Sequence, residues 1–116
     1  MAGSNLYSGT LDLLILRSLS WGALHGYGIG QWIHRSSAEV LKVEEGALYP
    51  ALHRLEKQGW LESEWGQTPR KRQAKFYRLS ATGREHLKAE TRRWNEHASA
   101  MRAVLEAPAQ PTGAES

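Results

Sequence analysis

The sequence of 116 residues contains no cysteine. A disulfide framework, a thiolate nucleophile and a zinc site with cysteine ligands are therefore excluded, and a cytoplasmic protein is favoured. Long apolar runs are also missing, because no stretch approaches the roughly 20 residues that a membrane-spanning helix needs. Residues 1–10 lack the basic and apolar regions of a signal peptide. We expect a cytoplasmic protein without a membrane partner.

Spacings typical of catalysis are missing as well. The five histidines form no His-Glu-x-x-His pair, and the sequence has no Gly-x-Ser-x-Gly motif. Gly26, Gly28 and Gly30 lie close together, but their spacing differs from that of the dinucleotide-binding motif Gly-x-Gly-x-x-Gly, and a predicted helix precedes them. We expect a protein that is not an enzyme and that binds no metal or cofactor.

Acidic residues are missing from residues 66–84, which contain six of the fifteen lysines and arginines. The remaining residues contain the other nine basic residues and all twelve acidic ones. A basic segment in a slightly acidic chain indicates a polyanion partner, with nucleic acid as the first candidate. The alternative is a solvated hairpin whose charges bind nothing.

The composition is otherwise that of one folded domain. Apolar residues make up 41% of the chain and the net charge is only +3, which supplies one core and disfavours intrinsic disorder. The length is close to that of a typical single domain, so an enzyme with two lobes is not expected.

Two helices are predicted in the first third of the chain. The first begins at Thr10, a suitable N-cap, and ends at Leu19. It is apolar on almost every side, so it must be covered both by the chain's own core and by a second protein surface. The second helix lies within residues 25–33, with Ile29, Trp32 and Ile33 on one face.

A third helix and a hairpin follow. The third helix begins after Glu44 and ends at Gly59, which is expected to adopt the left-handed conformation. Its buried stripe consists of Leu48, Leu52 and Leu55. Alternating residues then predict strands at 61–65 and 73–79, joined by a turn over residues 66–72. The fold class is therefore mainly α with a small β-hairpin, in the element order of a winged helix-turn-helix.

This fold predicts how the chain would bind double-stranded DNA. The third helix would enter the major groove and the basic hairpin would reach the phosphate backbone. The winged-helix domain spans residues 10–79, and residues 1–9 are expected to form a flexible arm. The predicted DNA-binding residues are Tyr49, Pro50, His53, Arg54 and Lys57 on the third helix, and Arg70, Lys71, Arg72 and Lys75 on the hairpin.

A last helix is predicted from Ser80, its N-cap, to Leu105. Its apolar seam has alternating spacings of four and three residues and consists of Leu87, Thr91, Trp94, Ala98, Met101 and Leu105. The helix would be longer than its own domain, so we expect a homodimerisation helix over residues 80–105, supported by Leu14. The alternative is a seam that folds back on its own core. Residues 106–116 are expected to form a disordered tail.

Three segments of the chain resemble a known family. They are Gly-Thr-Leu-Asp-Leu-Leu-Ile-Leu at 9–16, His-Gly-Tyr-Gly-Ile at 25–29 and Glu-Gly-Ala-Leu-Tyr-Pro-Ala-Leu-His-Arg-Leu-Glu at 45–56. The chain is similar over about residues 9–105 to the PadR family, the phenolic-acid-responsive type of bacterial transcriptional regulator, in its branch with a short C-terminal helix. The resemblance implies a winged-helix dimer joined by its final helices, usually a repressor that a small molecule or stress releases. Glu44 and the basic wing at 67–72 depart from the family pattern, so no operator sequence is carried over.

The sequence therefore predicts a DNA-binding transcriptional repressor that acts as a homodimer. The alternative is a winged-helix module that binds another protein and has no effector. Trp94 is large for a seam between two helices, which suggests a cavity between two copies. The resemblance implies that a flat aromatic effector could stack there, with Leu11 and Ile15 as further lining residues. A purely structural tryptophan is the other interpretation.

Overall fold

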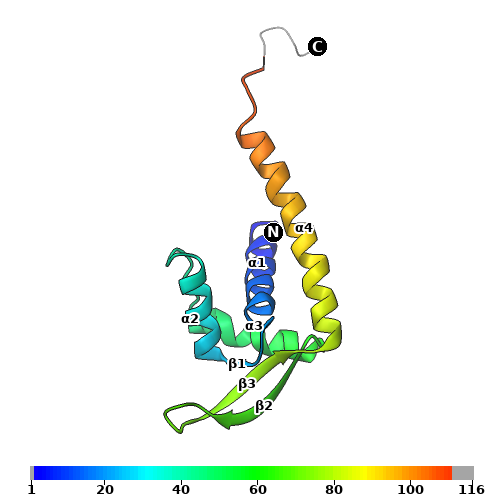
Figure 1. The fold of residues 1–116 in the computed structure, drawn as a ribbon. Coiled ribbons are helices and arrows are strands. Elements are labelled where there is room, and N and C mark those ends of the chain that lie inside the picture. Colours follow the sequence, from blue (N-terminus) through cyan, green and yellow to red (C-terminus); the bar gives the residue numbers. More distant parts are fainter. Residues whose placement is uncertain (1, 111–116) are drawn as a thin grey trace.

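The computed structural model describes residues 2–110 (Figure 1). Four helices and a small antiparallel sheet confirm the predicted fold class, a winged helix with a long final helix. The elements are α1 (Ala2–Ser18), β1 (Leu24–His25), α2 (Gly26–Ser36), α3 (Glu45–Lys57), β2 (Leu61–Gln67), β3 (Gln73–Leu79) and α4 (Ala81–Leu105).

The sheet has the strand order β1-β3-β2, with both pairs antiparallel. β2 and β3 form the predicted hairpin, in which Leu61 is paired with Leu79 and Gln67 with Gln73. β1 pairs Leu24 with Tyr77. This strand was not predicted, because alternation cannot be recognised in only two residues.

The core lies where α1, α2, α3 and the sheet meet. The predicted stripe of α3 is confirmed, since Leu48, Leu52 and Leu55 are buried. The other buried apolar residues include Ile15 and Leu16 of α1, Leu19 just after it, Ile29 and Ile33 of α2, Leu61 and Leu79 of the hairpin, and Leu87 of α4. One side of this apolar segment is thus covered within one chain, whereas Leu11, Leu13 and Leu14 are only partly buried.

α4 is anchored to the end of α3. The Ser80 hydroxyl donates a hydrogen bond to the Gly59 carbonyl (2.6 Å) and accepts one from the Gly83 N–H (3.0 Å), so Ser80 is the N-cap that the sequence predicts. Gly59 has the predicted left-handed conformation, with φ of 84°. Gly83 has no room for a side chain, because a methyl group there would lie 2.1 Å from the Trp60 carbonyl oxygen. The long helix is therefore fixed relative to α3.

The start of α1 differs from the prediction. The helix begins at Ala2, so residues 2–9 are helical where a flexible arm was expected, and Thr10 lies inside the helix rather than at its cap. Proline is absent from residues 2–10, and glycine and serine weaken a helix by at most about 1 kcal/mol each. A good N-cap residue therefore did not determine where the helix begins.

The end of α4 agrees with the prediction, because the helix ends at Leu105. α4 continues past the level at which α1 begins (Figure 1). Residues 107–110 are not helical. Residues 111–116 of the expected tail lie outside the described residues.

Candidate nucleic-acid interface

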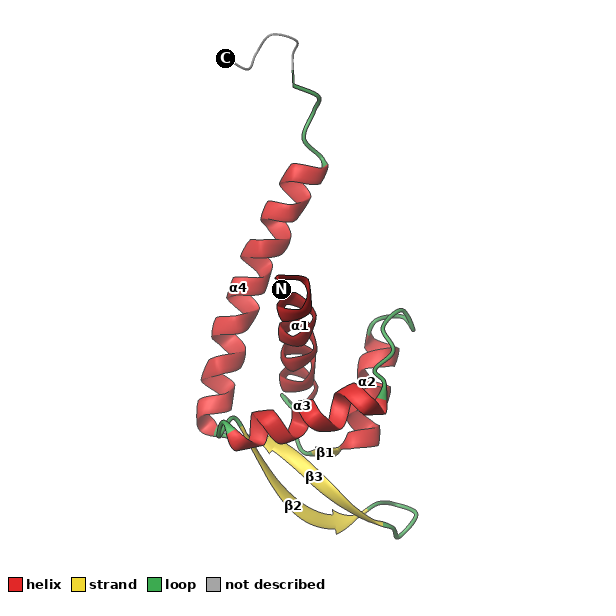
Figure 2. Cartoon of the chain, turned by 180° about the vertical axis from the view of Figure 1, so that it is seen from behind, coloured by secondary structure: helices red, strands yellow, loops and turns green. Residues whose placement is uncertain are grey.

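One face of α3 is free of contacts with the core. Pro50, His53 and Lys57 are exposed and lie opposite the buried leucines of the same helix. The hairpin extends from the sheet next to this helix (Figure 2). The structure thus places these three predicted residues together on one exposed surface.

Tyr49 lies at the edge of this face, toward the wing. Its side chain is 47% exposed, and its ring rests on the first residue of α2, since a methyl group added at Gly26 would lie 2.7 Å from the Tyr49 hydroxyl oxygen. Tyr49 lines a wing recess of about 940 Å³ together with Tyr27, Trp65, Arg70 and Arg72. Tyr27 and Trp65 were missed from sequence, although both are largely exposed aromatic residues beside predicted contact residues.

The tip of the wing, residues 68–72, is a hydrogen-bonded turn. The Thr68 N–H donates to the Arg72 carbonyl and the Lys71 N–H donates to the Thr68 carbonyl, both at 2.8 Å. Lys71 has a positive φ of 63°, which this turn requires. Arg70, Lys71 and Arg72 are exposed, and no acidic residue between 2 and 110 forms an ion pair with them. Their charges are available to a partner.

The other basic residues of segment 66–84 are engaged within the chain. The Arg78 guanidinium pairs with Glu62 at 3.2 Å and with Glu64 at 3.1 Å. Arg84 belongs to α4 and donates a hydrogen bond to the Ser20 carbonyl (3.3 Å). Within the hairpin, positive charge is therefore free mainly at the wing tip, whereas Arg84 on α4 has a neutral partner and keeps its charge.

Lys75, a predicted DNA contact, is held by α3. Its ammonium nitrogen lies 3.3 Å from a Glu56 carboxylate oxygen, and the other oxygen accepts a hydrogen bond from the Ser63 hydroxyl (2.5 Å). These contacts join α3 to both strands of the hairpin, β2 through Ser63 and β3 through Lys75. The Ser63 hydrogen bond is the main cause of a lowered pKa of the Glu56 carboxyl group, and Lys75 adds to it.

This lowered pKa predicts an acid-dependent loss of stability. The Glu56 link is fully present above the ordinary pKa of a glutamate and is lost as the pH falls through the lower pKa of the folded state. Because Glu56 is partly exposed, we expect a contribution below about 1 kcal/mol. Urea unfolding of wild type and Glu56→Gln should differ at about pH 7 and converge at about pH 3. A constant difference at both pH values would contradict this role.

Arg54 is also engaged inside the chain. Its guanidinium forms an ion pair with Asp12 of α1, although the side chain is still 43% exposed. Burial of the Asp12 carboxyl raises its pKa, and Arg54 acts in the opposite direction. Arg54 stays a predicted DNA contact, but its charge is shared with Asp12. Its partner is 42 residues away in sequence, which helix periodicity cannot reveal.

The predicted seam of α4 divides into two parts. Leu87 is only 9% exposed and packs in the core of its own chain, so the seam does fold back at this position and Leu87 is not an exposed dimer residue. The Thr91 hydroxyl donates a hydrogen bond to the Leu87 carbonyl (2.7 Å). Beyond it lies the outer seam, which consists of Trp94, Ala98, Met101 and Leu105. Leu14 of α1 is half-buried.

The predicted effector site also changes. Ile15 is 0% exposed and lies in the core of one chain, so it has no surface for a ligand between two copies, and this assignment is wrong. Leu11 is only partly buried. A separate hollow, which lies between the end of α1 and α4, includes Leu87 and Thr91 but not Trp94.

The comparison with known families decides the identity. Residues 15–89, more than half of the chain, match the transcriptional regulator PadR-like family. The chain belongs to this PadR-like family. A PadR-like protein is a DNA-binding transcriptional regulator and not an enzyme, as the sequence predicts. Between residues 2 and 110, no helix of this regulator is both long and apolar enough to cross a membrane.

Solved structures share the fold of this PadR-like regulator. A transcriptional regulator from Clostridium thermocellum is 28% identical, with a TM-score of 0.75 over 85% of this chain and 93% of that one. A PadR family regulator from Eggerthella lenta is 29% identical, with a TM-score of 0.74 over 92% of this chain and 91% of that one. An uncharacterized protein from Lysinibacillus sphaericus is 30% identical over 96 residues, which are 83% of this chain and 88% of the relative.

Proposed function

We propose that this PadR-like regulator binds operator DNA in the cytoplasm as a homodimer and represses transcription. The main support for this mode of DNA binding is the wing recess. Tyr49 of α3 and two wing residues, Arg70 and Arg72, line the same hollow. A helix suited to the major groove and a basic turn suited to phosphates thus adjoin each other. Pro50, His53 and Lys57 extend this surface along α3.

The proposal is tested by binding of the full chain to duplex DNA at several salt concentrations. A protein that neutralises phosphates gives a steep linear fall of log K with log salt. Selection from a random duplex pool should then enrich one operator sequence. A winged-helix module that binds another protein, the alternative function, would give neither a steep slope nor enrichment.

Dimerisation is supported by the outer seam. Trp94, Met101 and Leu105 are 46%, 48% and 77% exposed in one chain, and α4 extends past α1, so these apolar side chains have no cover of their own. Two copies of one helix can cover each other symmetrically. We further propose that a small planar aromatic effector stacks on Trp94 near Leu11 and releases DNA. Titration of flat aromatic compounds should quench tryptophan fluorescence in wild type but not in Trp94→Phe.

The contact between Gly26 and Tyr49 gives a prediction about specificity. In Gly26→Ala the new methyl group would overlap the tip of the Tyr49 side chain, which is flexible and partly exposed. The ring should therefore swing away while the fold is kept. We expect thermal stability to change by less than about 1 kcal/mol and the preferred operator sequence to change.

The control for this prediction is Gly30→Ala. Gly30 also lies in α2, but a methyl group there meets no atom within 4 Å. Selection from a random duplex pool and thermal unfolding would be measured for both variants. An unchanged preference in Gly26→Ala would show that the position of Tyr49 does not determine specificity.

A further inference from the structure

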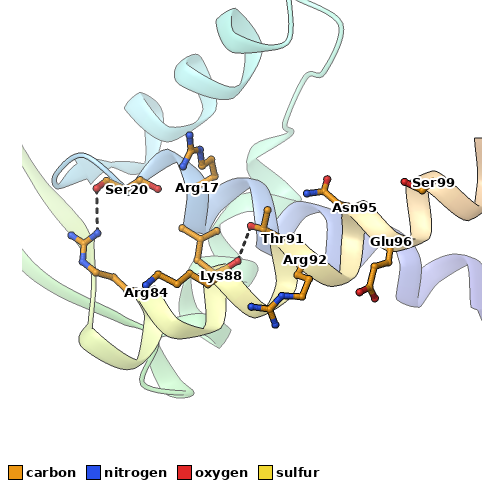
Figure 3. Close-up of a pocket in the computed structure, with 10 residues that line it drawn as sticks. Arg17, Ser20, Arg84, Lys88, Thr91, Arg92, Asn95, Glu96 and Ser99 are labelled. Atoms are coloured by element: carbon orange, nitrogen blue, oxygen red, sulfur yellow. Dashed lines mark hydrogen bonds between the residues drawn. The ribbon is translucent and has the colours of Figure 1, made fainter.

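A second hollow lies between the end of α1 and one face of α4 (Figure 3). This α1–α4 groove has a volume of about 910 Å³, and its lining extends along α4 from Arg84 to Ser99, with Arg17 contributed by α1 and Ser20 by the turn that follows it. It shares no lining residue with the wing recess. The groove is therefore a separate site, built from helices other than the recognition helix.

The charge of the lining is strongly positive. Four basic residues, Arg17, Arg84, Lys88 and Arg92, are accompanied by a single acidic one, Glu96. None of the four forms an ion pair with an acidic residue between positions 2 and 110. By contrast, Arg93, on another face of α4, is paired with Glu90 at 3.0 Å. Positive charge has thus been left without compensation along this groove.

Two of the guanidinium groups are held in place by neutral partners. Arg84 donates a hydrogen bond to the Ser20 carbonyl, across from α4 to the end of α1 (Figure 3). The guanidinium carbon of Arg17 lies 4.5 Å from the centre of the Trp21 ring. Such contacts orient an arginine without neutralising it. Both groups therefore keep donors and charge for a ligand.

An unpaired hydroxyl group lies at the same place. The Ser20 hydroxyl oxygen is buried and has no hydrogen-bond partner among the described residues. A buried hydroxyl without a partner is unfavourable, and native structures supply one from protein, water or ligand. Because this oxygen has almost no accessible surface, it does not open into the groove. The site itself combines the unneutralised cations with an apolar portion of the wall that Leu87 supplies.

We propose that the α1–α4 groove binds a small, multiply charged anion that carries phosphate or carboxylate groups. Guanidinium groups donate pairs of hydrogen bonds to both kinds of oxyanion, and several cations in one groove match more than one negative charge. The volume lies in the range of small-molecule sites. An anion here would contact both α1 and α4, the helix that carries the outer seam. Any effect of the anion on DNA binding rests on the proposed function, whereas binding of the anion itself does not.

Calorimetric titration of the full chain without DNA tests the site. The probes are pyrophosphate for the phosphate class and citrate for the carboxylate class, each at low ionic strength because salt screens such contacts. Arg84→Gln combined with Lys88→Gln should weaken binding of the preferred probe about tenfold or more, since charge-assisted hydrogen bonds are lost. Arg93→Gln combined with Arg102→Gln removes the same charge from α4 outside the groove and should bind as wild type does.

The variant with Arg70, Lys71 and Arg72 all replaced by glutamine separates this site from the wing. It should bind the anion as tightly as wild type, even if it has lost affinity for DNA. Failure of the wild type to bind DNA, with intact anion binding, would contradict the proposed function alone. No binding of either probe to wild type, or equal binding by the Arg84→Gln/Lys88→Gln variant, would overturn the anion site.

Two further outcomes would assign the groove to another partner. If Arg84→Gln with Lys88→Gln reduces the salt dependence of DNA binding, the groove contacts phosphates of the duplex, and the inference is wrong. If the same variant is monomeric in sedimentation while the control variant is dimeric, carboxylates of a second copy occupy the groove, which also overturns it. The expected result is an unchanged salt dependence and an unchanged oligomeric state.

Discussion

Replacing Arg70, Lys71 and Arg72 together by glutamine is expected to reduce DNA affinity about a hundredfold or more at moderate salt and to flatten its salt dependence. These side chains are exposed at the wing tip and have no acidic partner between residues 2 and 110. Each phosphate contact contributes about 0.9 to the slope of log K against log salt. A dimer that loses three contacts per chain should therefore lose about 5 from its slope.

Single substitutions in the hairpin provide the matched control. Arg72→Gln should lower the slope, because its charge is free. Arg78→Gln removes one charge from β3 but should leave the slope unchanged, because Arg78 is already paired with Glu62 and Glu64. Since phosphates are common to all sequences, Arg72→Gln should weaken binding equally on operator and random duplexes. Equal slopes for Arg72→Gln and Arg78→Gln would exclude the wing from phosphate contact.

Local patterns predicted most of this fold. The leucine stripe of α3, the cap at Ser80, the left-handed Gly59 and the end of α4 at Leu105 all depend on residues that are close in sequence. These features follow from helix periodicity and from the hydrogen bonds that helix ends require. The two-residue strand β1 depends instead on its pairing with β3, and a segment of that length carries no pattern of its own.

The availability of charged side chains was the part that local patterns could not predict. Lys75 and Arg54 have the residue type and position of DNA contacts, yet their charges are engaged by Glu56 and Asp12. Both carboxylates lie on neighbouring elements that the fold brings close. Conversely, Arg17 and Arg84 lie 67 positions apart in the numbering and line one groove only after folding. A basic residue becomes a candidate contact only when its neighbours in space are known.

The seam of α4 shows the same limit. Its heptad spacing is correct for a helix that buries one face, but spacing alone cannot distinguish a face covered by the same chain from a face covered by a second copy. Leu87 is covered by its own core, whereas Trp94 and Met101 are about half exposed. α4 is longer than the part of it that packs beside α1 (Figure 1), so one helix carries both kinds of position.

Trp94→Glu combined with Met101→Glu is expected to convert the proposed homodimer into a folded monomer. Both side chains are partly exposed in one chain, so charges there should leave the core, including Leu87, intact. Between two copies the same carboxylates would be buried without partners, at a cost of several kcal/mol. Sedimentation velocity should report a monomer, and thermal unfolding should still be cooperative.

Ala100→Glu combined with Ala103→Glu is the matched control for this variant. Both alanines are exposed on α4 and lie on the face away from the outer seam, so the control should remain a dimer. The monomeric variant should show about half the salt slope of wild type on DNA. It should also lose the preference for two half-sites whose centres are one helical turn, about 10 base pairs, or a multiple apart. A dimer that persists in Trp94→Glu/Met101→Glu would place the interface outside the outer seam and remove the basis for this half-site spacing.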